Sequence, residues 1–213
     1  MPRAALTADE IDAFRDELVD AATRRFAAHG FGGVTLRGLA GDLGCSPMTP
    51  YRYFRDKAEI FTAVRVAAFG RFADGQEVAA ASTDDALARL TALADAYLEF
   101  ARDDPDGYRL MFELTQPTDG STPELDAQAV RAWQPLRETA SAVIDAGILA
   151  GDPDVLAHVV WAALHGAVAL HLAGRLRLGC ELEPLAATIM DTIIRGAAAP
   201  HDIPRKRAGG TRS

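Results

Sequence analysis

Apolar residues recur along almost the whole chain at the three- and four-residue spacing of amphipathic helices. One such run passes through Phe14, Leu18 and Phe26. It begins after the capping box TADE, which starts at Thr7, and ends near Gly30, a residue type that suits the left-handed position after a helix. Strict apolar–polar alternation and Asn-Gly hairpin signals are scarce. The pattern therefore predicts an all-α protein of about nine helices.

Capping residues and prolines mark where the later helices begin. A second capping box, Asp56-Lys-Ala-Glu59, predicts a helix that runs to about Gly75. Ser82 is expected to open the next helix, which runs to about Asp103. Proline is tolerated in a first helical turn because its missing N–H has no partner there. The prolines that mark such turns are Pro105, Pro123, Pro153 and Pro184.

The segment 34–57, VTLRGLAGDLGCSPMTPYRYFRDK, fits two short helices joined by a tight turn. The first is expected over about 35–43, with Thr35 as its N-cap. Gly44 provides the corner, because glycine readily adopts a positive φ. The second helix is expected to begin after the N-cap Ser46 and to end near Phe54. This arrangement predicts a helix-turn-helix.

These elements divide the chain into a small and a large domain. Residues 1–56 are expected to form a three-helix domain that contains the helix-turn-helix, and residues 57–199 a larger helical domain. Residues 200–213 lack apolar periodicity and are predicted to be a disordered tail. Residues 115–121 are predicted to form a loop.

The short second helix can place its N-terminal end in a DNA major groove. Thr49 then offers a hydroxyl and a methyl group to base edges, and Met48 offers an apolar contact. Phosphate oxygens are within reach of Tyr51, Arg52 and Tyr53. Lys57 opens the following helix, where backbone N–H groups also favour a phosphate.

The charge distribution agrees with an anionic partner for the N-terminal part. The whole chain has a net charge of −8. Residues 24–72 nevertheless contain 8 basic and 3 acidic side chains, whereas residues 76–200 contain 8 basic and 19 acidic ones. A basic window in front of an acidic body indicates that nucleic acid, if it binds, binds near the N-terminus.

The runs FGGVTLRGLA (31–40) and LGCSPMTPYRYFRDK (43–57) resemble the DNA-binding domain of the TetR/AcrR family of bacterial transcriptional regulators. The resemblance covers about residues 10–60. It implies an all-helical homodimer, in most members a repressor, whose larger domain binds a small molecule and releases DNA. The run Trp161-Ala-Ala-Leu-His165-Gly166 also resembles a Trp–His–Gly subtype of this family.

Carried over by position, the family's phosphate contacts fall on Thr35, Tyr51, Tyr53 and Lys57, and its groove contacts on Arg37, Pro47, Met48 and Thr49. Pro50 replaces the usual aliphatic residue, and Met48 stands where many members have glycine, which leaves the operator sequence open. The complete candidate DNA-binding set is Thr35, Arg37, Ser46, Pro47, Met48, Thr49, Tyr51, Arg52, Tyr53 and Lys57.

Aromatic residues gather in the middle helices and predict a small-molecule site in the larger domain. Most pockets are lined by apolar side chains with a few polar groups, although most of these aromatics would also serve as ordinary core. Because no Lys or Arg falls clearly inside this set, we expect a largely apolar effector that is uncharged or cationic. The candidates are Phe69, Phe72, Tyr97, Phe100, Tyr108, Met111, Phe112, Trp133, Trp161 and His165.

Two late helices, expected over about 153–177 and 184–196, are rich in small and apolar residues and predict a homodimer interface. Residues 155–174 carry no formal charge and have the length of a membrane span. Their three histidines and many small residues favour a helix buried in protein, so we expect no membrane association. The two lone cysteines and the lack of a signal sequence indicate a cytoplasmic protein.

Other classes of function find less support in the sequence. No nucleophile elbow, P-loop or dinucleotide fingerprint occurs, so we expect no enzyme and no cofactor, although two carboxylates brought together by folding could still catalyse a reaction. His158 and His165 share a helix face but lack the spacing of a metal site, and we expect none. A helical protein that binds small molecules without binding DNA remains the alternative.

Overall fold

The computed structural model describes residues 7–112 and 121–199, which form eight α-helices and one 3₁₀ turn. The all-α class is therefore confirmed. The predicted tail 200–213 and almost all of the predicted loop 115–121 lie outside the described residues. The elements are α1 (Ala8–Gly33), α2 (Leu36–Asp42), η1 (Pro50–Arg52), α3 (Lys57–Ala81), α4 (Ala86–Asp103), α5 (Pro105–Phe112), α6 (Pro123–Asp145), α7 (Pro153–Leu172) and α8 (Leu182–Gly196).

Most helix starts follow the capping signals in the sequence. The box at Thr7 is complete, with both reciprocal hydrogen bonds formed. Asp56 caps α3 by accepting a hydrogen bond from the Glu59 amide. Gly30 has a φ of +64° and interrupts α1, as expected for a helix-ending glycine.

Three expected boundaries are wrong. Helix α7, which was expected to reach about residue 177, ends at Leu172, and Gly174 just beyond it has a positive φ of 63°. The third helix continues past Gly75 to Ala81, because good helix formers follow that glycine. Ser82 does not open α4. Its hydroxyl instead donates to the Ala79 carbonyl at the end of α3, and Asp85 caps α4 by accepting from the Ala88 amide at 2.7 Å.

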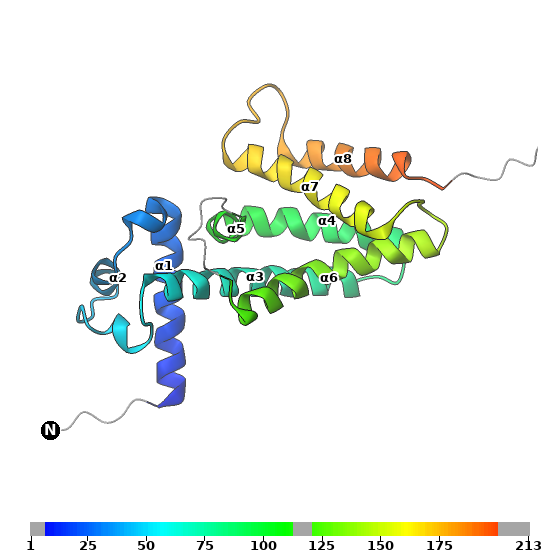
Figure 1. Ribbon diagram of the computed structural model, residues 1–213. Coiled ribbons are helices and arrows are strands. Elements are labelled where there is room, and N and C mark those ends of the chain that lie inside the picture. Colours follow the sequence, from blue (N-terminus) through cyan, green and yellow to red (C-terminus); the bar gives the residue numbers. More distant parts are fainter. Residues whose placement is uncertain (1–6, 113–120, 200–213) are drawn as a thin grey trace, which may run out of the picture.

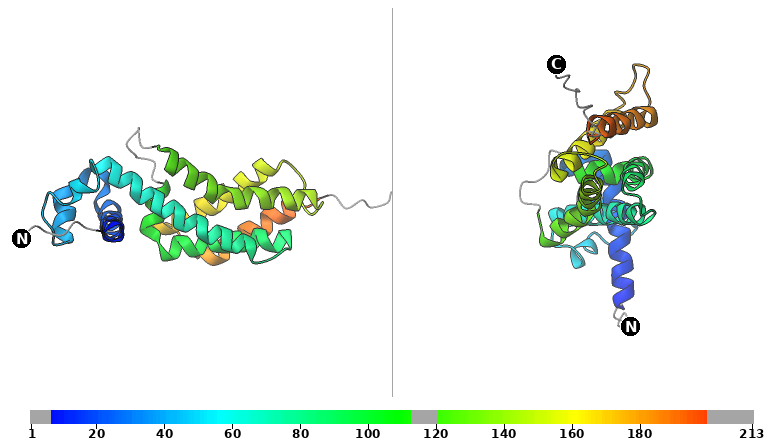
Figure 2. Two further views of the ribbon diagram at one scale, coloured as in Figure 1. Left: turned by 90° about the horizontal axis from the view of Figure 1, so that it is seen from below. Right: turned by 90° about the vertical axis from the view of Figure 1, so that its right-hand side faces the viewer.

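The molecule is elongated, with a small N-terminal head at one end and a helical body behind it (Figure 1). The head consists of α1, α2 and η1 together with the start of α3. The body consists of the rest of α3 and of α4 to α8. Figure 2 shows α3 extending from the head along the body beside α6.

Two hydrophobic clusters form the core, one in the head and one in the body. Helix α3 contributes to both: Ile60 and Val64 lie in the head cluster, whereas Ala68 and Phe72 lie in the body cluster. Leu110 of α5 is the body's contribution to the head cluster and is only 1% exposed. The head and the body are therefore joined by shared apolar packing.

Replacing Leu110 with alanine tests how much this joint contributes. We expect Leu110→Ala to lower the free energy of unfolding by about 2–5 kcal/mol, because it removes buried methyl groups and leaves a cavity. Leu178→Ala is the matched control, since Leu178 is 98% exposed and its truncation should cost almost nothing. Urea unfolding followed by circular dichroism measures both. Equal effects of the two substitutions would contradict the shared packing between head and body.

Candidate DNA-binding surface and effector cavity

The turn after α2 is built as a helix-turn-helix corner. Thr35 caps α2 by accepting from the Gly38 amide at 3.1 Å, while Leu39 is buried in the head. Gly44 has a φ of +62°, which reverses the chain direction. The Cys45 amide then donates to the Ala40 carbonyl at 2.9 Å and closes the turn.

The second helix of the motif is shorter than expected. In place of a helix from Ser46 to about Phe54, the chain forms a turn followed by the single 3₁₀ turn η1. Pro50 explains this correction, because it has no N–H to donate to the Ser46 carbonyl. That carbonyl accepts from the Thr49 amide at 2.8 Å instead, and the Pro50 ring is buried. The lost N–H therefore changes the local structure, contrary to the expectation that it matters little.

The short element nevertheless presents a polar and aromatic surface to solvent. Met48 is 67% exposed, the largest exposure in this turn among large apolar side chains. Phe54 points inward and is buried. Thr49 is half-buried. The other exposed members of the candidate set on α2 and this turn are Thr35, Arg37, Ser46, Pro47, Tyr51 and Arg52.

Two candidate phosphate contacts also have structural partners inside the head. The Tyr53 ring packs against Phe14, with 4.7 Å between ring centres. The Lys57 ammonium donates to the Phe31 carbonyl at 2.7 Å and lies 4.3 Å from the centre of the Phe31 ring. This hydrogen bond uses one of the three N–H groups of the ammonium and leaves the other two for further acceptors. The proposed phosphate contacts of Tyr53 and Lys57 remain predictions.

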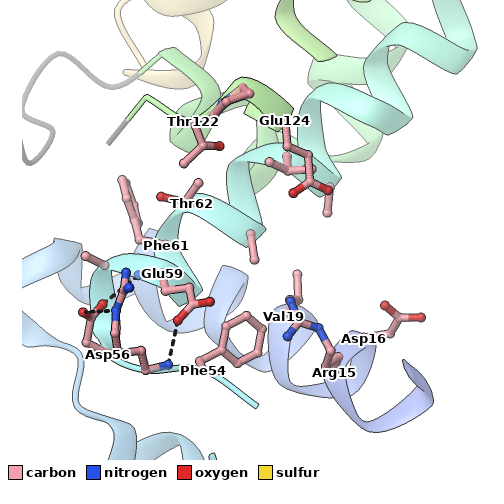
Figure 3. Close-up of a pocket in the computed structure, with 16 residues that line it drawn as sticks. Arg15, Asp16, Val19, Phe54, Asp56, Glu59, Phe61, Thr62, Thr122 and Glu124 are labelled. Atoms are coloured by element: carbon pink, nitrogen blue, oxygen red, sulfur yellow. Dashed lines mark hydrogen bonds and ion pairs between the residues drawn. The ribbon is translucent and has the colours of Figure 1, made fainter. Parts of the chain in front are cut away.

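A cleft of about 790 Å³ lies where the head meets the body (Figure 3). Val19 of α1 and Phe54 form one side, and Thr122 and Glu124 at the start of α6 form the other. Between them runs the first part of α3, with Thr62 on the cleft wall. The α6 start and α1 thus face each other across open space rather than through packed side chains.

A second cavity, of about 450 Å³, lies in the body, where side chains of α3, α4, α5, α6 and α7 line it. Six of the candidate effector residues line it: Phe69, Phe72, Tyr97, Phe112, Trp133 and Trp161. The sequence analysis missed the remaining lining residues, which are Gln76, Ala129, Ala132, Leu136 and His158. Helical spacing provides a signal that could have found Gln76, because it follows Phe72 by one turn on the same face of α3.

Four candidates do not line this cavity. Phe100 packs on Phe72, with 5.2 Å between ring centres, and Met111 is buried in the body core. Tyr108 and His165 lie behind Tyr97 and hydrogen-bond to it. Phe100, Tyr108 and His165 therefore support the cavity wall rather than form it.

Tyr97, Tyr108 and His165 form a polar triad inside the apolar body. The two hydroxyl oxygens are 2.7 Å apart, and the Tyr108 oxygen is 2.8 Å from His165 Nδ1. Burial raises the pKa of both tyrosines, so both keep their protons. Burial lowers the pKa of His165 below its usual value, so its imidazole is neutral near pH 7. Nδ1 can then accept from the Tyr108 hydroxyl, which accepts from Tyr97.

Within residues 7–112 and 121–199, no group of three or more His, Cys, Asp or Glu side chains could hold a metal ion. Helix α7 is long and apolar enough by composition to span a membrane. It packs in the protein against α4, α6 and α8.

The lowered pKa of His165 predicts a pH effect on stability. Below about pH 6.5 the unfolded chain takes up a proton that the folded protein resists, so stability falls as the pH decreases. Between about pH 7.5 and about pH 5.5 we expect the wild type to lose more thermal stability than His165→Asn, which keeps an acceptor but does not titrate. His171→Asn changes an exposed histidine on α7 and should behave like the wild type. Equal losses of thermal stability in all three proteins would contradict a lowered pKa of His165.

Comparison with known proteins assigns both parts of the chain. A family profile described as bacterial regulatory proteins of the tetR family matches residues 18–64. A second profile, described as the C-terminal domain of tetracyclin repressor-like proteins, matches residues 90–193. The first match contains the helix-turn-helix, and the second contains most of the cavity wall.

Individual relatives support the same assignment. The chain is 31% identical over 109 residues to the HTH-type transcriptional activator FasR of Mycolicibacterium smegmatis, and this match spans about half the length of each protein. A solved structure of a protein with unknown function from Rhodococcus sp. RHA1 is 26% identical, with a TM-score of 0.76 over 93% of this chain and 99% of the other.

The fold is shared with more distant regulators as well. The structure of the transcriptional regulator FadR from Bacillus subtilis in complex with stearoyl-CoA has a TM-score of 0.73 at 16% identity, covering 85% of this chain and 98% of that one. The family profiles and the named relatives are transcription regulators rather than enzymes. The chain thus carries an N-terminal helix-turn-helix domain and a C-terminal domain that each match the TetR family of transcriptional regulators.

Proposed function

We propose that this protein is a ligand-responsive repressor that, as a homodimer, binds a palindromic DNA operator and leaves it when a small molecule occupies the body cavity. The observation that carries the proposal is the course of α3. This one helix starts at Lys57 beside the DNA-binding turn and lines the cavity with Phe69 and Phe72.

The head supports the DNA-binding part of the proposal. The turn after Gly44 is held on a buried core, while Met48 and Tyr51 stand out from it. Rigid placement of a few outward side chains is what direct reading of base edges requires. Arg37 and Arg52 are exposed on the same head and can contact phosphates.

The body supports the switching part. A ligand that displaces Phe69 or Phe72 pushes on a helix whose first turns belong to the head core. The cleft between α1 and the α6 start provides space in which the head can shift relative to the body. Movement of the two heads in a dimer would change their spacing on DNA. A ligand that binds the altered spacing more tightly than the DNA-binding spacing would then release the operator.

One face of α7 supports the dimer. Val155, Val159 and Leu170 are exposed apolar side chains on this helix, and Gly166 lies exposed between them. Their spacing places them on one side of the helix. An exposed apolar stripe of this kind fits a self-complementary twofold interface with α7 and α8 of a second copy. Two heads related by a twofold axis require a palindromic operator.

The run from Trp161 to Gly166 supports the Trp–His–Gly subtype as a finer assignment. Trp161 lines the cavity, His165 supports its wall, and Gly166 lies on the proposed dimer face. A DNA-binding regulator of this kind acts in the cytoplasm, where it reaches the chromosome.

An electrophoretic shift with the promoter of the protein's own gene tests the function directly. Specific binding of the homodimer supports the proposal, and no binding at low salt favours a small-molecule-binding protein without DNA. A reporter fused to the same promoter gives the direction of regulation. Deletion of the gene raises the reporter output for a repressor and lowers it for an activator.

Two substitutions in the reading turn separate base contacts from phosphate contacts. We expect Thr49→Ala to cost about 1–3 kcal/mol on the operator and little on random DNA, because it removes a base contact. Tyr51→Phe removes one hydroxyl and should weaken binding to both DNAs by a similar factor. Fluorescence anisotropy at several salt concentrations measures the affinities. If Thr49→Ala weakens both DNAs equally, Thr49 does not read bases.

A charge on the α7 face tests the dimer. A Cβ added at Gly166 meets nothing within 4 Å, so Gly166→Arg fits the protomer and is expected to split the dimer by burying an unpaired charge. Val78→Arg is the control, because Val78 is an exposed residue on α3, away from this face. Light scattering gives the mass of each protein. A dimeric Gly166→Arg variant, or a monomeric wild type at micromolar concentration, contradicts the interface.

A further inference from the structure

The body cavity has an aromatic wall with little formal charge. Trp133 and Trp161 meet edge to face, with 6.0 Å between ring centres, and Phe72 and Tyr97 do the same at 5.5 Å. Among the described residues that line it there is no Lys, Arg, Asp or Glu, and His158 is the one ionisable side chain besides Tyr97. A carboxylate or phosphate placed here would lose its hydration without gaining a counter-charge.

Gln76 is the buried amide in this wall. It is 4% exposed, and its Nε2 donates to the Leu93 carbonyl of α4 at 3.4 Å. This contact determines the orientation of the amide, because the reverse orientation would place two oxygens against each other. The Gln76 oxygen, Oε1, must therefore point away from the Leu93 carbonyl.

The Gln76 oxygen accepts no hydrogen bond from the described part of the chain. The Gln76 oxygen is also not enclosed by protein atoms. An enclosed oxygen without a partner would be a buried unpaired atom, and among the described residues the one such side-chain atom is Arg65 Nε. Because Gln76 as a residue is almost fully buried and lines the cavity, the space that its oxygen reaches is the cavity itself.

His158 adds a second acceptor at the rim. Its Nδ1 lies 2.7 Å from the Asp154 carbonyl, so Nδ1 carries the proton in the neutral ring and Nε2 carries the lone pair. The ring packs on Trp133, with 4.5 Å between centres. Both acceptors lie among π faces, which favour apolar rings and cations but not anions.

We infer that the cavity selects an apolar, ring-containing molecule that carries one hydroxyl or amino group, and that Gln76 Oε1 accepts the hydrogen bond from that group. This inference names the effector class and rests on the proposed function for its regulatory meaning. Gln76 belongs to α3, so the recognised group contacts the helix that reaches the head.

The two tryptophans of the chain, Trp133 and Trp161, both line the cavity and report its occupancy through their fluorescence. Adamantanol, its methyl ether, adamantylamine and adamantanecarboxylate are matched probes, since they share one apolar cage and do not absorb with tryptophan. We expect the alcohol to bind about tenfold or more tightly than the methyl ether, which lacks the donor, and the carboxylate to bind weakest.

Substitutions at Gln76 then identify the acceptor. Gln76→Met keeps the side-chain length and removes the acceptor, so it should abolish the preference for the alcohol over the ether. Gln76→Glu keeps an acceptor and adds a charge, so it should retain the preference and bind adamantylamine more tightly than the wild type. Gln134→Met is the matched control on exposed α6 surface and should leave all four affinities unchanged.

Three outcomes would overturn the inference: equal binding of alcohol and ether by the wild type, tightest binding of the carboxylate, or a preference that survives in Gln76→Met. Thermal melts without probe show whether each variant is folded. If Gln76→Met does not fold, Gln76→Glu still tests the inference. Operator DNA is added in a separate titration. Selective binding of the alcohol without DNA release refutes the proposed switch and leaves the effector class standing.

Discussion

The membership of α3 in two hydrophobic cores is the constraint on which the rest of the structure depends. A regular helix is stiff along its axis, so Val64 in the head and Phe72 in the body cannot move independently. Leu110 of α5 provides a second connection, because this side chain belongs to a body helix but packs in the head core. Head orientation and cavity shape are therefore coupled through packing alone, as close-packed interiors transmit displacement rather than absorb it.

The cavity lies beside the packed pair of helices α3 and α6, and aromatic rings form much of its wall. Arg131 of α6 also links the two helices by pairing with Asp74 and Glu77 of α3, and its Nη2 lies 2.5 Å from an oxygen of each. These groups are exposed, so the ion pairs contribute little to stability. Apolar packing of the two helices below them holds the wall, and Gln76 interrupts it with one polar atom that water or a ligand must satisfy.

One residue, Pro50, determines the conformation of the second helix of the helix-turn-helix. Pro50 removes an amide from what would be a helix and replaces it with a buried ring. The chain responds with a 3₁₀ turn, whose shorter repeat fits the remaining donors. Arg15 of α1 then donates to the Tyr53 carbonyl at 2.8 Å and covers the Phe54 ring, which anchors the end of the turn to α1.

The helices and the helix-turn-helix could be predicted from the sequence because they depend on local signals. Thr7, Asp56 and Asp152 each cap a helix through hydrogen bonds to residues within three positions, and Gly44 adopts the positive φ that its turn requires. The aromatic content of the middle helices likewise predicted an apolar site in the body, because pockets are lined mainly by apolar side chains with a few polar groups.

Tertiary structure decided which of these side chains face the cavity and which support it. Tyr97 and Tyr108 are eleven positions apart and equivalent in composition, yet only Tyr97 reaches the cavity, because Tyr108 is held behind it by His165 on a helix far along the chain. The spacing of Gln76 from Phe72 places both on one face of α3, but nothing in the sequence shows that this glutamine is buried. It became the cavity's polar group because α4 packs over α3 and presents the Leu93 carbonyl to its amide, a contact that no local pattern encodes.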